Sequence, residues 1–100
     1  MSEAGVSMAE PGVLRLTGVL DYRSGPVLRK DGKALIGACR EPRLVLDCSE
    51  VLKSSSVGLS LLLAFMRDGQ CAGKTCELRG IPEDMREIAQ VYDLDEVLAV

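Results

Sequence analysis

A chain of 100 residues with a formal net charge of −3 and a pI of about 4.9 fits a single domain. Hydrophobic residues make up 47% of it and charged residues 27%, which is ordinary for a folded globular protein. The acidic balance argues against a nucleic-acid surface, and no apolar run approaches the ~20 residues that span a bilayer. Residues 1–12 lack the basic start and long apolar block of a secretory signal, and their composition predicts a flexible tail.

The cysteines do not follow a metal-binding or disulfide pattern. The four residues Cys39, Cys48, Cys71 and Cys76 include no C-x-x-C pair, and the chain has no histidine to complete a zinc site. Three of them lie in apolar stretches, where a free cysteine behaves as a small hydrophobe. We therefore expect reduced thiols, as is usual in the cytosol, with no metal and no cofactor.

The first half of the chain predicts two strands, a helix and a third strand. Alternation over residues 13–17 predicts a strand, Gly18 a turn, and residues 19–20 a short second strand that forms a hairpin with the first. Pro26 suits the first turn of a helix, which apolar residues at helical spacing continue to residue 39. Residues 43–48 have an apolar centre that is typical of a strand buried on both faces.

The second half continues the alternation of helices and strands. An apolar helix is predicted to end at residue 68, before Gly69, and residues 74–79 predict another strand. Glu83 suits the first turn of an amphipathic last helix, and residues 94–98 hold a short apolar element. This order predicts an α/β domain over residues 13–100, with a mixed sheet of four to five strands and helices mainly on one face.

Three serines, Ser54, Ser55 and Ser56, stand where the chain turns into the second helix. A helix start has unpaired backbone N–H groups and a partial positive charge, so it can hold a phosphate, be capped, or meet a partner. Capping needs only one serine and adds roughly 1 kcal/mol, which leaves two serines unexplained. A phosphate on Ser56 would add about −1.5 to −2 charge. Capping and a switch or contact site both stay open from the residues alone.

Few residues could carry out catalysis. The chain lacks histidine, which is the usual general base. Nothing pairs Asp21, Asp47 or Glu50 as an acid and a base, and the stretch Ser56-Val57-Gly58 lacks the flanking glycine and lysine of a phosphate-binding loop. We therefore expect no enzyme activity.

Three segments resemble the STAS domain family, named for sulfate transporters and anti-sigma factor antagonists. Residues 18–21 (GVLD) are similar to the G-x-L-D turn after the family's first strand, and residues 44–51 (LVLDCSEV) to its central strand. Residues 55–59 (SSVGL) are similar to the D-[ST]-[SG]-G-L start of its second helix, with a serine in place of the acid. The resemblance implies a STAS-like fold and assigns the family's phosphorylated or regulatory position to Ser56.

A narrower resemblance is to the small stand-alone STAS subunits of the phospholipid-transport ABC complexes of Gram-negative bacteria. It rests on residues 78–82 (LRGIP) and 88–94 (IAQVYDL). It implies a non-catalytic cytoplasmic subunit, peripheral to the inner membrane through its complex, that binds the ATPase and reaches the permease only indirectly. Such transporters maintain outer-membrane lipid asymmetry.

The resemblance also implies a partner surface around the start of the second helix and on the first helix: Ser54, Ser55, Ser56, Val57 and Arg29. Taken by itself, Arg29 would be a solvated helix charge beside Lys30, and Val57 a residue that packs inward. The alternative function is an anti-sigma factor antagonist that is switched by phosphorylation of Ser56.

Overall fold

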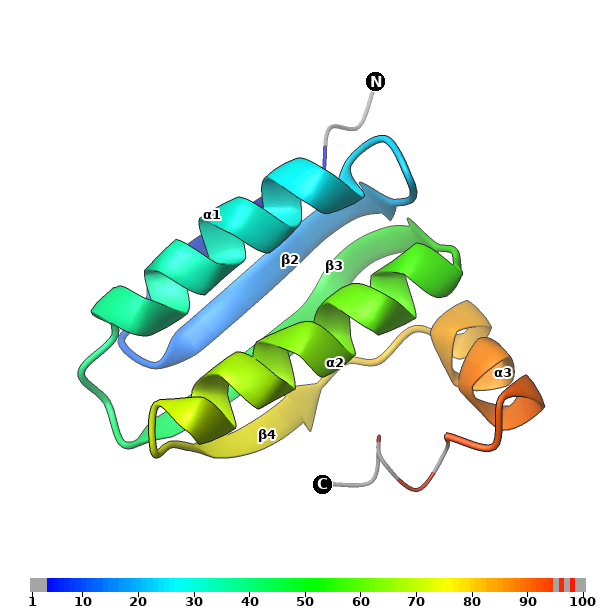
Figure 1. Cartoon of the computed structure of the whole chain (residues 1–100). Coiled ribbons are helices and arrows are strands. Elements are labelled where there is room, and N and C mark those ends of the chain that lie inside the picture. The colour runs from blue at the N-terminus through cyan, green and yellow to red at the C-terminus, as the bar shows by residue number, and fades with distance from the viewer. Residues whose placement is uncertain (1–3, 95, 97, 99–100) are drawn as a thin grey trace.

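The computed structural model describes residues 4–94, 96 and 98 and has two layers, a sheet and the helices that cover one of its faces (Figure 1). In chain order the elements are β1 (Gly5–Glu10), β2 (Val13–Leu20), α1 (Gly25–Ala38), β3 (Arg43–Ser54), α2 (Ser56–Cys71), β4 (Thr75–Arg79) and α3 (Glu83–Val91). The four strands lie in the order β1-β2-β3-β4; β1 is antiparallel to β2, and the other pairs are parallel. The predicted α/β fold with a mixed sheet is confirmed.

Two predictions about the beginning of the chain were wrong. The segment expected as a tail contains strand β1, whose Val6 and Met8 pack against the core. The segment expected as a hairpin is the single strand β2, and its true hairpin partner is β1. Gly18 has a φ of 82°, but it lies at a register shift inside β2 rather than in a turn. The polar residues of β1 weaken the alternation of apolar and polar side chains, and this explains why the sequence predicted a flexible tail there.

The ends of β3 and α2 also differ from the predictions. β3 runs on to Ser54, through the expected turn, because it continues to pair with β2 after β4 has ended. α2 continues through Gly69, which was expected to end it, and stops at Cys71. A Cβ on Gly69 would lie 2.8 Å from the Cys76 sulfur, so this glycine allows close packing of α2 on β4.

The apolar element expected at residues 94–98 lies partly outside the described residues, since the structure does not describe Val97. Leu98 is buried in the core, and Leu94 packs against it.

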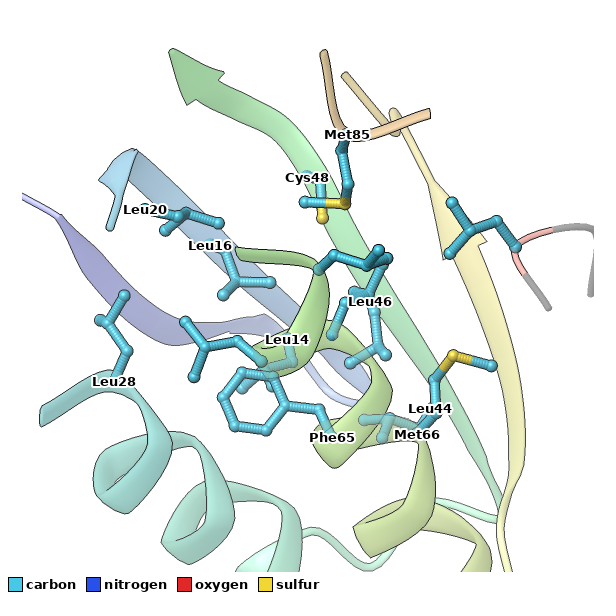
Figure 2. Packing of buried hydrophobic residues seen from close by; sticks show 14 of the residues in the cluster. Leu14, Leu16, Leu20, Leu28, Leu44, Leu46, Cys48, Phe65, Met66 and Met85 are labelled. Atoms are coloured by element: carbon cyan, nitrogen blue, oxygen red, sulfur yellow. The ribbon is translucent and has the colours of Figure 1, made fainter. Parts of the chain in front are cut away.

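The core lies between the sheet and the helices. Alternate residues of β2 and β3 point toward α1 and α2, and the ring of Phe65 in α2 occupies the space between the two helices and the sheet (Figure 2). A Cβ on Gly32 of α1 would overlap that ring, so α1 and α2 approach closely only because residue 32 is glycine. The largest fully buried side chains are Leu14, Leu16, Leu20, Ile36, Leu44, Leu46, Asp47, Cys48, Leu62, Phe65 and Met85.

The opposite face of the sheet is closed by its own charged side chains. Arg15, Asp47 and Arg79 are neighbours across β2, β3 and β4. Arg15 Nε donates to Asp47 Oδ2 at 3.1 Å, and Asp47 is only 2% exposed. Burial raises the pKa of Asp47, but hydrogen bonds from Ser49 and Arg15 outweigh it and hold the pKa below the ordinary 3.8. This part of the outer face is therefore held together by an ion pair.

A close contact at Gly58 gives a stability prediction. A Cβ at Gly58 would overlap Ser54 Oγ and lie 3.1 Å from the Cβ of Leu20. We expect Gly58→Ala to lower the free energy of unfolding by about 1–3 kcal/mol in urea denaturation, because the site has no room for a methyl group. Gly37→Ala is the control, since nothing lies within 4 Å of a Cβ there. Equal losses in the two variants would contradict this prediction.

The Arg15–Asp47 pair predicts how stability depends on pH. Because folding lowers the pKa of Asp47, its contribution is complete above the ordinary pKa of 3.8 and is lost as the pH falls through the folded value. We expect Asp47→Asn to be less stable than the wild type at pH 7 and to lose less stability on acidification below pH 3.8. Glu10→Gln removes an exposed acid from the same sheet and controls for net charge. Parallel pH curves for the wild type and Asp47→Asn would rule out this role.

Candidate functional site

The serine turn lies at the edge of the sheet where the parallel strands β2 and β3 end. Ser54, the last residue of β3, is 5% exposed, and its hydroxyl donates to the carbonyl of Ser55 at 2.9 Å. Ser55 is the N-cap of α2, with its Oγ accepting from the Val57 N–H at 3.1 Å. The N–H and the hydroxyl of Ser55 also donate to the carbonyl of Leu20, at 3.0 and 3.2 Å. Ser54 and Ser55 thus hold the turn together, whereas Ser56 is exposed and takes no part in the cap.

Val57 packs inward and also forms part of a surface groove. Its side chain is half-buried and lies so close to Gly25 that a Cβ there would be 2.8 Å from Val57 Cγ1. The two helices consequently begin side by side, and between them runs an open apolar groove of about 480 Å³. We call it the α1–α2 groove. It is lined by Tyr22, Gly25, Pro26, Arg29, Val57, Ser60, Leu61 and Ala64.

Arg29 joins α1 to α2 instead of extending into solvent. Its guanidinium makes two hydrogen bonds to the carboxylate of Asp68, at 2.6 and 3.3 Å. The same guanidinium carbon lies 5.9 Å from the centre of the Phe65 ring. Arg29 is therefore an ion-paired wall of the α1–α2 groove, and its expected contact with a partner stays a prediction.

A second groove of about 300 Å³ lies on the other side of α2. We call it the α2–α3 groove. Ser60, one turn after Ser56, lines both grooves, so these two serines form a small polar ridge between two apolar hollows. The residues that line the second groove are Ser56, Leu59, Ser60, Leu63, Tyr92 and Leu94.

The chain's two tyrosines stand at the outer edges of these grooves. Tyr22 is 75% exposed and Tyr92 is 62% exposed. Tyr92 stands at helical spacing from the buried Met85 and Ala89, which by itself predicts a buried side chain; it is exposed because α3 ends one residue earlier, at Val91. Sequence reasoning also missed Tyr22 and Ser60. The spacing of Ser56 and Ser60 within an otherwise apolar helix is the signal that could have found the ridge.

The loop that carries Tyr22 is shaped by Asp21. Its carboxylate accepts from the backbone N–H groups of Arg23 at 2.9 Å and Ser24 at 3.3 Å. These bonds, that to Arg23 foremost, hold the pKa of Asp21 below its ordinary value. Ser24 Oγ in turn donates to the carbonyl of Val19 at 3.0 Å. The loop is thus held to β2 and directs Tyr22 outward at the start of α1.

The remaining reactive groups do not gather at this face. Over residues 4–94, 96 and 98, no three cysteine or carboxylate side chains meet in a metal-binding arrangement. Burial, helped by the charge of Asp47, raises the pKa of the Cys48 thiol to about 12, and burial also raises that of Cys76. These two thiols are therefore protonated and poor nucleophiles. None of the helices described is both long and apolar enough to cross a bilayer.

Comparison with known proteins gives the family. The family described as "Mlab, STAS domain" matches residues 6–99, which is nearly the whole chain. The protein belongs to the STAS domain family. The match begins inside β1, so the STAS domain of this chain includes the strand that we had expected to be a tail.

Solved structures share this STAS fold across most of the chain. A chain of the Acinetobacter MlaFEDB complex in an ATP-bound conformation is 20% identical, with a TM-score of 0.80 over 96% of this chain and 98% of that one. An anti-sigma factor antagonist from Mycobacterium paratuberculosis is 27% identical, with a TM-score of 0.67 over 97% and 82%. The unphosphorylated antagonist SpoIIAA is 17% identical, with a TM-score of 0.71 over 94% and 84%. The fold is thus common to a chain of the MlaFEDB complex and to anti-sigma factor antagonists.

The different roles of the adjacent serines can be tested by truncation. Ser55→Ala removes the cap of α2, so we expect the free energy of unfolding to fall by about 1 kcal/mol in urea denaturation. Ser56→Ala should change it by less than about 0.5 kcal/mol, as for other surface positions. A larger loss from Ser56→Ala than from Ser55→Ala would reverse the assignment of the cap.

Proposed function

We propose that this protein is a non-catalytic STAS subunit that binds the ATPase of an ABC transporter moving phospholipids between membranes. The observation that carries the proposal is the pair of apolar grooves on either side of the serine ridge, each edged by an exposed tyrosine. The family description and the likeness to a chain of the MlaFEDB complex support a transport complex as its place of action. In this role it is cytoplasmic, peripheral to the inner membrane through its complex, and reaches the permease only through the ATPase.

The chemistry of this face suits binding. Apolar hollows with aromatic edges are where interface energy concentrates, because a partner's side chains can be fully desolvated there. Ser56 and Ser60 are small, so a partner can approach the ridge between the hollows closely. The opposite face of the sheet carries the paired charges of Arg15 and Asp47. The groove beside Arg79 at the end of that face has a lining that includes the charged residues Glu41 and Arg43.

Such a subunit would act without any chemical step of its own. If it binds the assembled, competent arrangement of the ATPase more tightly than other arrangements, it raises the population of that arrangement by mass action. The proposal therefore needs only complementary surfaces and a rigid scaffold to hold them.

A second candidate function is an anti-sigma factor antagonist switched by phosphorylation of Ser56. The exposure of Ser56 at the start of α2 favours it, because the helix dipole tolerates a phosphate there. Against it, the acid that the family pattern has before this residue is replaced by Ser55, whose side chain is occupied as the N-cap. We therefore rank the transporter subunit first.

Affinity purification of the tagged protein from its native cells, with mass spectrometry of what is bound, separates the two functions. Recovery of an ABC ATPase together with a permease would support the transporter subunit. Recovery of a protein kinase and a sigma-factor regulator would overturn it in favour of the switch.

Ser56→Glu tests the serine ridge as the contact surface. A negative charge is favourable at a helix start, so the fold should stay intact by circular dichroism and thermal melting. We expect at least about tenfold weaker binding to the purified ATPase in calorimetry, because the charge would be desolvated against the partner. Ser7→Glu, an exposed serine on β1, is the control and should bind normally. Normal binding by folded Ser56→Glu would move the interface elsewhere.

A further inference from the structure

The helix α3 is too short to be stable without contacts to the rest of the domain. It has nine residues, of which only Met85 and Ala89 are buried. Isolated helices of this length are marginal in water, so α3 depends on what anchors its two ends. In Figure 1 it lies beyond the end of β4 and beside the start of α2. Its placement decides the shape of the α2–α3 groove.

The C-terminal end of α3 is closed by a backbone motif. Asp93 has a φ of 58°, its N–H donates to the carbonyl of Gln90 at 3.1 Å, and the N–H of Leu94 donates to that of Ala89 at 2.7 Å. These two bonds around a left-handed residue form a Schellman motif. Leu94 packs against the core after this turn, which leaves Tyr92 exposed beside the groove.

The N-terminal end of α3 is held by one side chain from its first turn. Asp84 Oδ2 accepts from the backbone N–H of Ser54 at 2.8 Å. The strand β4 has ended before this point, at Arg79 paired with Asp47, so the last part of β3 has no β4 neighbour. The carboxylate of Asp84 therefore provides an acceptor at the level where the sheet no longer has a fourth strand.

This bond reaches the serine turn itself. Ser54 directly precedes Ser55, the N-cap of α2, so one carboxylate connects α3 to the turn that presents Ser56. The hydrogen bond between Ser54 and Asp84 therefore links the two elements, α2 and α3, that stand on either side of the α2–α3 groove. The other oxygen, Oδ1, is buried and has no hydrogen-bond partner in the part of the chain described. A buried carboxylate oxygen without a hydrogen-bond partner lowers the free energy of unfolding. The position that Asp84 gives to α3 therefore explains this aspartate better than a gain in stability does.

We propose that Asp84 is the positioning residue of the partner-binding face. It holds α3 against the serine turn, so that the α2–α3 groove has its binding shape before the partner arrives. Preorganisation of this kind strengthens binding because less ordering is needed on association. This inference rests on the proposed function for the identity of the partner, but the contact between α3 and the serine turn does not.

Three substitutions at Asp84 and one at its neighbour test this role. Asp84→Ala removes the acceptor, Asp84→Asn keeps an acceptor in place without the charge, and Asp84→Glu keeps the charge but moves it by one methylene. Glu83→Ala is the matched control, because Glu83 is an exposed acid in the same first turn. The measurements are amide hydrogen exchange at Ser54 and through α3 by NMR, and calorimetric affinity for the purified ATPase.

We expect Asp84→Ala to speed exchange at Ser54 about tenfold and to weaken ATPase binding about tenfold, as the loss of one hydrogen bond predicts. Asp84→Asn should stay close to the wild type in both measurements, and Glu83→Ala should change neither. If Asp84→Ala does not fold, the other two Asp84 variants decide: the proposal requires normal binding by Asp84→Asn and weak binding by Asp84→Glu.

Several outcomes would overturn the proposal. Unchanged exchange at Ser54 in Asp84→Ala would show that the carboxylate does not hold α3, and faster exchange with unchanged affinity would remove its role in binding. Normal binding by Asp84→Glu with weak binding by Asp84→Asn would mean that charge, and not position, matters. If the wild-type protein does not bind the ATPase, the proposed function and the binding half of this inference both fail. Exchange at Ser54 would still decide whether Asp84 fixes α3.

Discussion

The carbonyl of Leu20, at the end of β2, is the point on which the candidate site depends. It accepts hydrogen bonds from both the N–H and the hydroxyl of Ser55, which ties the start of α2 to the neighbouring strand. Gly58 lies one turn further on and lets the helix backbone come this close to Leu20 and Ser54. Ser54 is buried, whereas Ser55 and Ser56 are both exposed. Because the Ser55 side chain is used as the cap, Ser56 is the exposed serine of the turn that takes no part in it.

The two faces of the sheet have different physical characters, and this difference is why we propose a partner surface on the helical side. Long charged side chains close the outer face, where Asp47 is buried beside Arg15. The helical layer instead exposes apolar hollows on either side of α2. Sigma-factor regulators and a transport-complex chain share this STAS fold, so the fold leaves the function open. We propose that the residues around Ser56 distinguish one use from another.

Local patterns predicted the elements whose signals are strong. Pro26 and helical spacing placed α1 within one residue at each end, and the apolar centre of residues 43–48 identified the buried strand. Elements with weak or ambiguous patterns were predicted wrongly. β1 has too few large apolar residues to alternate clearly, and Gly69 reads as a helix end although it serves close packing. Tyr92 follows the helical period, but its helix ends just before it.

The sequence by itself determined the α/β class and the family, because periodicity and short motifs are local properties of the chain. It also singled out the serine turn as a candidate site, which stays a prediction. Only the tertiary structure decided that Ser54 is buried and that Ser55 binds the carbonyl of Leu20, 35 residues away in sequence. It also decided that Arg29 pairs with Asp68, 39 residues away, and that Ser60 separates two grooves. Contacts between distant segments depend on how the helices pack on the sheet, and no local pattern in this chain encodes that packing.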